Sequence, residues 1–241
     1  MEKEKLIKLM NIIKESNNIV FFGGAGVSVA SGIPDFRGAN GLYNYTPEEI
    51  ISHHFFINNT KEFYDFYWDK MVYPNALPND CHKALVYLEN KNKLLSIVTQ
   101  NIDSLHQKAG STNVRELHGS VIRNYCMKCH KFYSLDQLSK KGIPNCSCGG
   151  IIKPDVVLYE EGLDENTIDN AIKDISKADT LIVAGTSLVV YPAASFIRFF
   201  RGKNLIIINL GETNYDNYST LTINGKVEDY LNISNFKEFN I

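Results

Sequence analysis

The sequence predicts an α/β fold built on a parallel sheet, with a smaller inserted module. Short runs of Val, Ile and Phe alternate along the chain with helical patterns, which is typical of strands buried on both faces. The expected strands are Ile19–Phe22, Leu94–Val98, Val156–Leu158, Thr180–Ala184 and Leu205–Asn209. A chain of 241 residues can bury one sizeable core, so we expect a single domain with a Rossmann-like sheet.

Two stretches interrupt this alternation. The aromatic-rich stretch Tyr43–Leu88 is too long for one crossover helix and predicts a helical insertion at about 41–88. Apolar periodicity fades again over about 121–152, where four of the five cysteines fall in two tight pairs. The Rossmann-like core would then comprise about 1–40, 89–120 and 153–241. A cleft between the sheet and the insertions is the expected site.

The composition and net charge limit the kinds of partner that the protein can bind. The chain has 44% hydrophobic and 22% charged residues, and 25 basic against 27 acidic residues give a formal charge of -2. This balance predicts neither nucleic acid nor an anionic membrane as a partner. The apolar runs are strand-length, and Leu6, Met10 and Ile13 at the start of the chain lie on one helical face. We therefore expect a cytoplasmic protein without a secretory peptide or a membrane span.

A glycine-rich segment follows the first expected strand. Gly23-Gly24-Ala25-Gly26 leads into Val27-Ser28-Val29, which suits a turn whose backbone amides approach a phosphate at a helix start. The full GxGxxG spacing is absent, because the next glycine is Gly32. By itself this segment is compatible with dinucleotide binding or with a plain tight turn.

Polar residues follow other strands in the same way. Gln100-Asn101-Ile102-Asp103 comes directly after one strand, and Gly185-Thr186-Ser187 and Asn209-Leu210 come after two others. Parallel sheets present such residues to a ligand at their carboxyl edge. Asp103 could instead simply cap the next helix.

Cysteine spacing predicts a metal site. Cys126-x-x-Cys129 and Cys146-x-Cys148 offer four thiolates, the number that a closed tetrahedral zinc site requires. The run Cys126–His130 also spells the attachment motif of c-type haem. The second pair of cysteines favours zinc, although its spacing is one residue shorter than the usual one.

Taken together, these segments resemble the sirtuin family of NAD-dependent protein lysine deacylases. The matching motifs are Gly24-Ala25-Gly26-Val27-Ser28 with Gly32-Ile33-Pro34-Asp35-Phe36-Arg37, then Thr99–His106, Leu117-His118-Gly119 and the cysteine pairs. They span about Gly23 to Val227, nearly the whole chain. The resemblance implies an enzyme that uses NAD as co-substrate and carries one structural zinc ion.

The resemblance also implies roles for individual residues. It assigns catalytic roles to His118, Asn101 and Asp103, with His118 as the general base. The residues that it assigns to NAD binding are Gly24, Ala25, Gly26, Val29, Asp35, Phe36, Arg37, Gln100, Asn101, Ile102, Asp103, His118, Gly185, Thr186, Ser187, Asn209, Leu210, Lys226 and Val227. Acyl-lysine and NAD would yield lysine, nicotinamide and O-acyl-ADP-ribose. Zinc, held by Cys126, Cys129, Cys146 and Cys148, would stay remote from the chemistry.

The substrate is expected to be an acyl-lysine peptide. Val156, Val157, Leu158 and Tyr159 resemble the family segment that pairs with the peptide backbone, although Tyr159-Glu160-Glu161 replaces the frequent Phe-Gly-Glu. Members that prefer succinyl or malonyl groups have a tyrosine followed three residues later by an arginine. Here Tyr64 is followed by Tyr67, so we expect neutral acyl groups such as acetyl to be preferred over succinyl.

Three other functions compete with deacylation. Mono-ADP-ribosyl transfer to a protein could occur on the same fold. A non-catalytic NAD or acyl-peptide binding module would fit if the catalytic histidine were missing, but His118 is present. A zinc-ribbon nucleic-acid binder is disfavoured because the charge is not strongly basic.

Overall fold

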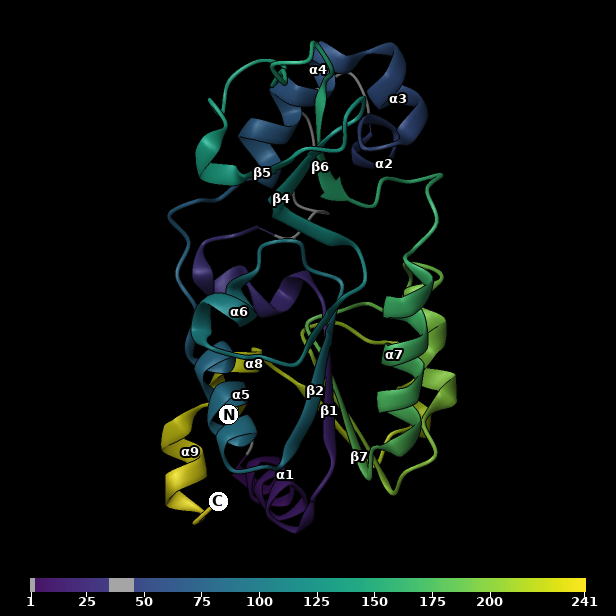
Figure 1. Ribbon diagram of the computed structural model, residues 1–241. Coiled ribbons are helices and arrows are strands. Elements are labelled where there is room, and N and C mark those ends of the chain that lie inside the picture. The colour runs from purple at the N-terminus through teal and green to yellow at the C-terminus, as the bar shows by residue number, and fades with distance from the viewer. Residues whose placement is uncertain (1–2, 35–45) are drawn as a thin grey trace.

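The protein forms two lobes in the computed structural model, which describes residues 3–34 and 46–241 (Figure 1). The large lobe is built on a six-stranded parallel sheet in the order β3-β2-β1-β7-β8-β9. The small lobe combines a three-stranded antiparallel sheet, ordered β5-β4-β6, with helices α2, α3 and α4.

The element bounds follow the sequence pattern closely. The strands are β1 (Ile19–Gly23), β2 (Leu94–Thr99), β3 (Val114–Glu116), β4 (Gly119–Cys126), β5 (Phe132–Ser134), β6 (Ile152–Val156), β7 (Thr180–Ala184), β8 (Asn204–Asn209) and β9 (Leu221–Asn224). The α-helices are α1 (Lys3–Glu15), α2 (Pro47–Ile50), α3 (His53–Asn58), α4 (Thr60–Phe66), α5 (Asp80–Asn90), α6 (Leu105–Ala109), α7 (Glu165–Lys177), α8 (Val227–Tyr230) and α9 (Ile233–Glu238). A π-helical turn over Tyr67–Met71 continues α4.

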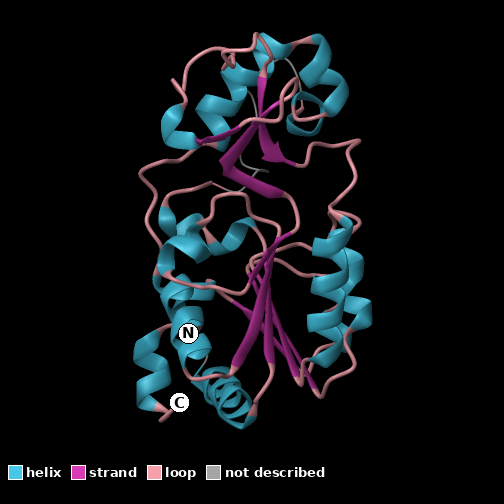
Figure 2. Cartoon of the chain, in the orientation of Figure 1, coloured by secondary structure: helices cyan, strands magenta, loops and turns pink. Residues whose placement is uncertain are grey.

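The central strands are mainly apolar because both faces of the large sheet are covered by helices (Figure 2). In β1, Ile19 and Phe21 point into one core cluster, which includes residues of α1 and α5. Val20 and Phe22 point into the opposite cluster, which includes residues of α7. This alternation is the period of two that a pleated strand imposes. It explains why the sequence shows a continuous apolar run instead of an alternating one.

The expected strands at Ile19–Phe22, Leu94–Val98, Thr180–Ala184 and Leu205–Asn209 are confirmed as β1, β2, β7 and β8. The expectation of a strand over Val156–Leu158 is wrong. Val156 ends β6 in the antiparallel sheet, and Val157 and Leu158 lie in the loop that follows. Val156 and Leu158 are both buried in the small-lobe core. An apolar run of three residues predicts that these residues are buried, but it cannot show which sheet they belong to.

Helix α5 packs on the large sheet rather than in the small lobe. Its residues Cys81, Ala84, Leu85 and Leu88 belong to the same core cluster as Ile19 and Phe21, so we count α5 with the large lobe. Among the helices of residues 3–34 and 46–241, none combines the length and the apolar character needed to cross a bilayer.

Candidate functional site

Two glycine loops meet at the carboxyl edge of the large sheet. The loop Gly24–Gly26 follows β1, and the loop Gly185–Ser187 follows its parallel neighbour β7. The Gly26 amide donates to the Gly185 carbonyl at 2.8 Å. A Cβ on Gly26 would lie 2.7 Å from the Cα of Gly185, so a larger residue there would force the loops apart. Beyond this contact, Val29 stands half-exposed in the following turn.

Ser28 joins the glycine loop to the end of β2. The Asn101 side-chain amide donates to Ser28 Oγ at 3.1 Å, and Ser28 Oγ donates to Asp103 Oδ2 at 2.6 Å. The other carboxylate oxygen of Asp103 accepts the amide of Leu105, the first residue of α6, at 2.8 Å, while Ser104 is the N-cap residue of that helix. Burial raises the pKa of Asp103, while the hydrogen bonds from Ser28 and Leu105 oppose that rise. The structure therefore brings Asn101 and Asp103 together in one network.

His118 lies where the chain crosses from β3 to β4. Its Nδ1 is 2.9 Å from the carbonyl oxygen of Gln100. Because a carbonyl can only accept, Nδ1 carries the proton and Nε2 keeps its lone pair. Burial lowers the pKa of His118 below its usual 6.5, which favours the neutral ring near pH 7. A left-handed glycine, Gly119, makes the turn, and a Cβ there would overlap the Asp155 carbonyl.

Gln100 provides a buried donor that has no partner among the described residues. Its Oε1 accepts the Thr186 hydroxyl at 3.0 Å, which connects the ends of β2 and β7. Its Nε2 is buried and unpaired within residues 3–34 and 46–241. Buried polar groups in native proteins are rarely left unsatisfied. An oxygen-rich ligand placed against these loops would satisfy Gln100, so the site fits a dinucleotide such as NAD.

The remaining predicted NAD residues lie along the same edge of the sheet or outside the described part of the chain. The Gly225 amide donates to the Asn209 carbonyl at 3.1 Å, which sets Lys226 beside the end of β8. Leu210 and Lys226 are exposed, whereas Val227 is buried in the core. Ile102 instead packs against the small-lobe cluster. Asp35, Phe36 and Arg37 fall outside the described residues.

The segment expected to pair with the substrate is already hydrogen-bonded to its own chain. The Val157 amide donates to the His118 carbonyl at 3.0 Å, and the Leu158 amide donates to Glu161 Oε2 at 2.9 Å. Tyr159 pairs through its amide and its carbonyl with Ile51 and His53. The amides of Val157, Leu158 and Tyr159 are therefore occupied within the chain, and the Glu161 amide also donates to the Leu158 carbonyl at 3.0 Å.

Tyr64 and Tyr67 lie in the core of the small lobe. Both side chains are fully buried. The Tyr64 hydroxyl donates to the Ile152 carbonyl at 2.5 Å, while the Tyr67 hydroxyl has no partner among the described residues. Burial raises the pKa of both phenols, so both stay neutral.

The four paired cysteines converge on one point. All four Sγ atoms lie within 4.8 Å of one another, with Cys126 and Cys148 3.4 Å apart and Cys129 and Cys146 3.7 Å apart. Zinc–sulfur bonds of about 2.3 Å in a tetrahedron separate the sulfurs by roughly 3.8 Å. The Tyr133 hydroxyl also donates to Cys146 Sγ at 3.0 Å. The cluster fits one structural zinc ion despite the short second spacing, and it favours zinc over haem attachment.

Asn79 connects the start of α5 to the glycine loop. Its Oδ1 caps α5 by accepting the Cys81 amide at 3.0 Å. Its Nδ2 donates to the Val27 carbonyl at 2.7 Å and to Ser31 Oγ at 3.0 Å, which ties α5 to the glycine loop. An Asn before a helix signals an N-cap, but the sequence cannot show what its amide nitrogen reaches.

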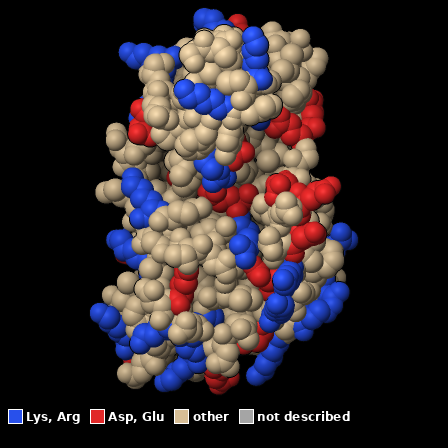
Figure 3. Space-filling view, in the orientation of Figure 1, with Lys and Arg blue, Asp and Glu red and all other residues tan. Residues whose placement is uncertain are grey.

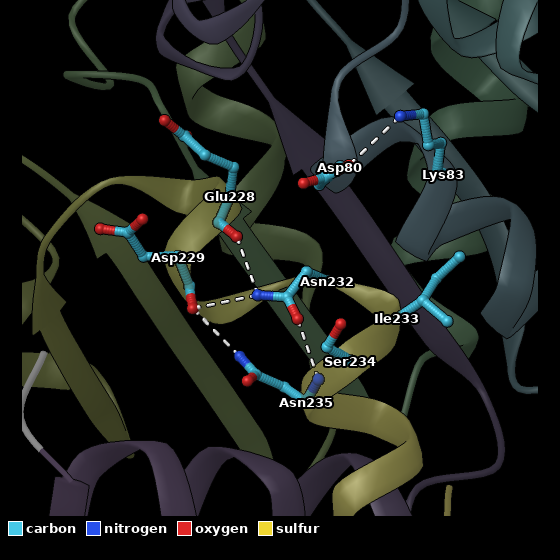
Figure 4. Close-up of a pocket in the computed structure, with 8 residues that line it drawn as sticks. All are labelled: Asp80, Lys83, Glu228, Asp229, Asn232, Ile233, Ser234 and Asn235. Atoms are coloured by element: carbon cyan, nitrogen blue, oxygen red, sulfur yellow. Dashed lines mark hydrogen bonds and ion pairs between the residues drawn. The ribbon is translucent and has the colours of Figure 1, made fainter.

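Cavities among the described residues also lie outside the glycine loops. One of about 680 Å³ opens between the lobes beside Asp103 and Arg123. Another, of about 670 Å³, lies between the start of α5 and helices α8 and α9, away from His118 (Figure 4). Its polar groups bond largely to one another, as Asn232 does to the Glu228 and Asp229 carbonyls, so we assign it no role.

Known proteins with similar sequences point to one family. A sequence model of the Sir2 family matches residues 24–192. An NAD-dependent protein deacetylase of Clostridium perfringens is 60% identical over 95% of this chain and 97% of its own, and one of Clostridium acetobutylicum is 56% identical over the same shares.

Solved structures of other proteins are similar to this chain over its whole length. A Sir2 complex with a p53 peptide and NAD+ has a TM-score of 0.86 at 38% identity, covering 100% of this chain and 99% of that one. Sir2 bound to a propionylated peptide has a TM-score of 0.85 at 37% identity, covering 100% of both chains. The resemblance carried by the sequence motifs is thus confirmed, and the chain belongs to the Sir2 family, the sirtuins.

Proposed function

We propose that this protein is an NAD-dependent protein lysine deacetylase. The observation that carries the proposal is the placement of His118, a histidine whose Nε2 keeps its lone pair, on the carbonyl of Gln100, the residue before Asn101. The relatives named as NAD-dependent protein deacetylases support it, because they align along nearly the full chain.

NAD, when bound, supplies the ribose that accepts the acyl group as nicotinamide leaves. In this proposal the loops Gly24–Gly26 and Gly185–Ser187 hold the dinucleotide together with Val29, Gln100 and Ile102. Asn209, Leu210, Lys226 and Val227 hold its adenosine end, with Val227 contributing only backbone because its side chain is buried in the core. Asp35, Phe36 and Arg37 would complete the site, with Phe36 shielding the reactive carbon from water.

His118 acts as the general base. Its Nε2 can take a proton from a ribose hydroxyl because the Gln100 carbonyl fixes the proton on Nδ1. Asn101 and Asp103 orient the sugar and the nicotinamide amide, and Ser28 holds both of them in place. His118, Asn101 and Asp103 are each held by a neighbour before the substrate arrives.

The protein substrate enters as an extended acyl-lysine peptide near the Val156–Tyr159 segment. Since the amides of Val157, Leu158 and Tyr159 are occupied, the peptide pairs with other backbone groups of this segment, such as its carbonyls. The zinc ion, held by Cys126, Cys129, Cys146 and Cys148, supports the small lobe and takes no part in the reaction.

Acetyl is preferred over succinyl in this proposal. A desolvated acyl carboxylate needs a charged partner. Tyr67 is a neutral, buried phenol, and the Tyr64 hydroxyl is already bonded to Ile152. Neither residue compensates a negative charge.

Mass spectrometry of the products tests the function. The protein is incubated with NAD and matched peptides carrying acetyl-lysine or unmodified lysine. Loss of the acetyl group together with NAD-dependent appearance of O-acetyl-ADP-ribose is the expected result. Addition of ADP-ribose to either peptide without deacetylation would support mono-ADP-ribosyl transfer instead, and binding without turnover would support a non-catalytic module.

A further inference from the structure

One arginine joins the two lobes where the chain crosses between them. Arg123 lies on β4 of the small lobe, and its Nη1 donates to Glu116 Oε2 at 2.6 Å. Glu116 ends β3 at the edge of the large sheet. The Nε of Arg123 donates to Asp155 Oδ2 on β6 at 2.7 Å. We call these three residues the Arg123 bridge; charges of both signs gather at this junction in Figure 3.

The Arg123 bridge is partly shielded from water. The Glu116 side chain is only 8% exposed and that of Arg123 is 33% exposed. Charge-assisted bonds in such a setting are stronger than those of exposed pairs. Loss of the arginine would leave the Glu116 carboxylate buried and without its cation, which is more costly than removing both partners.

The Arg123 bridge continues into the residues around the reactive centre. Glu116 Oε1 accepts the Ser104 hydroxyl at 3.1 Å, and Ser104 Oγ lies 2.5 Å from Ser120 Oγ. Ser104 follows Asp103 directly and has a left-handed backbone with φ of 58°. Ser120 is two residues beyond His118. The Glu116 carboxylate therefore connects the arginine to the neighbours of both Asp103 and His118.

We propose that Arg123 is a positioning residue for the deacetylation reaction, acting through Glu116 to fix His118 relative to Asp103. The proposal rests on the function proposed above. Arg123 reaches over the Leu117–Gly119 crossing from the small lobe to the large one, so the bridge limits rotation of one sheet against the other at that turn. A displacement of about 1 Å at a reacting group can cost roughly 100-fold in rate.

A matched pair of arginine substitutions tests the proposal. Arg123→Met removes the bridge, whereas Arg115→Met removes an ion pair of similar burial, Arg115 to Asp174, that lies inside the large lobe. We expect Arg123→Met to lower kcat at saturating NAD and peptide by about tenfold and to weaken inhibition by nicotinamide. Arg115→Met should leave both within about twofold, even where it lowers Tm.

Two further variants separate positioning from general damage. Glu116→Gln combined with Arg123→Met should recover the stability lost by Arg123→Met, because no unpaired carboxylate remains, while kcat stays low because the bridge is still missing. Arg123→Lys should instead keep part of the kcat that Arg123→Met loses, since it keeps the charge but not the forked geometry. A kcat and nicotinamide inhibition unchanged in Arg123→Met, or reduced equally in Arg115→Met, would overturn the proposal.

Hydrogen exchange tests the bridge without relying on activity. The Val121 amide donates to the Ile102 carbonyl across the lobes at 3.0 Å, and the Leu105 amide donates to Asp103. Both amides should exchange faster in Arg123→Met than in Arg115→Met, and equal exchange would contradict the bridge. If the wild-type protein showed no deacetylation, the proposed function would be wrong. The comparison of exchange rates between Arg123→Met and Arg115→Met would still show whether the bridge holds the segments around Val121 and Leu105 in place.

Discussion

The Nδ1 atom of His118 lies 2.9 Å from the carbonyl oxygen of Gln100, so the backbone at the end of β2 selects the tautomer of the histidine. The same residue, Gln100, bonds through its side chain to Thr186 after β7. Gln100 therefore connects the proposed general base to the proposed NAD loops. A mutation that moves this strand end would disturb both together.

Replacement of His118 should lower the rate of the reaction without weakening NAD binding. We expect His118→Ala to lower deacetylation by about 10²- to 10⁴-fold while NAD affinity, measured by calorimetry, changes little. His54→Ala is the control, because His54 is exposed on the small lobe. A wild-type rate in His118→Ala would refute the assigned base.

The pH dependence of the rate should reflect the burial of His118. Burial lowers its pKa below 6.5, and the base must be neutral to accept a proton. We therefore expect kcat/KM to fall only as the pH drops below about 6.5. Steady-state rates in overlapping buffers measure this, and an acid limb centred above pH 7 would contradict the expectation.

Two buried histidines should make the folded state sensitive to acid. The rings of His82 and His106 lie 4.7 Å apart. Burial lowers the pKa of His82 to about 4 and that of His106 well below 6.5. Their contribution to stability is therefore present above pH 6.5 and is lost as the pH falls toward 4, because only the unfolded chain binds the protons.

Urea unfolding at pH 7.5 and pH 5 measures that loss. The free energy of unfolding should drop by about 2 kcal/mol for each buried histidine. In His82→Gln the difference between the two pH values should shrink, whatever the absolute stability of the variant. The same difference in wild type and His82→Gln would show that other groups cause the acid sensitivity.

Metal removal should affect the small lobe first. We expect about one zinc per chain after purification without added metal. Chelation should speed hydrogen exchange over β4, β5 and β6 and lower activity indirectly. Cys146→Ser should behave like the chelated protein. Full activity and unchanged exchange without zinc, or a haem absorption band, would rule out this assignment.

Matched peptides test the acyl preference. Acetyl-lysine should be processed with a higher kcat/KM than succinyl-lysine on the same peptide, because Tyr67 offers no positive charge. Tyr67→Phe should keep this preference, since the hydroxyl that it removes is unpaired among the described residues. A preference for succinyl would show that a positively charged side chain elsewhere binds the acyl carboxylate.

The sequence predicts the large sheet well because burial on both faces leaves a strong signal in strands such as Ile19–Phe22. It also predicts the zinc cluster, since ligand chemistry restricts the residue types. It fails at Val156–Leu158, where a short apolar run could belong to either sheet. It cannot reveal Asn79 or Arg123 as links, because their partners Val27 and Asp155 are brought near only by the tertiary fold.

The sheet order also sets when the site can form during synthesis. Ile19 of β1 pairs with Thr180 of β7, so the two glycine loops come from distant parts of the chain. By contrast, β4, β5 and β6 with all four zinc ligands lie within residues 119–156. Local contacts form faster than distant ones. A nascent chain could therefore assemble its zinc sheet early, whereas the dinucleotide site would wait until β7 has left the ribosome.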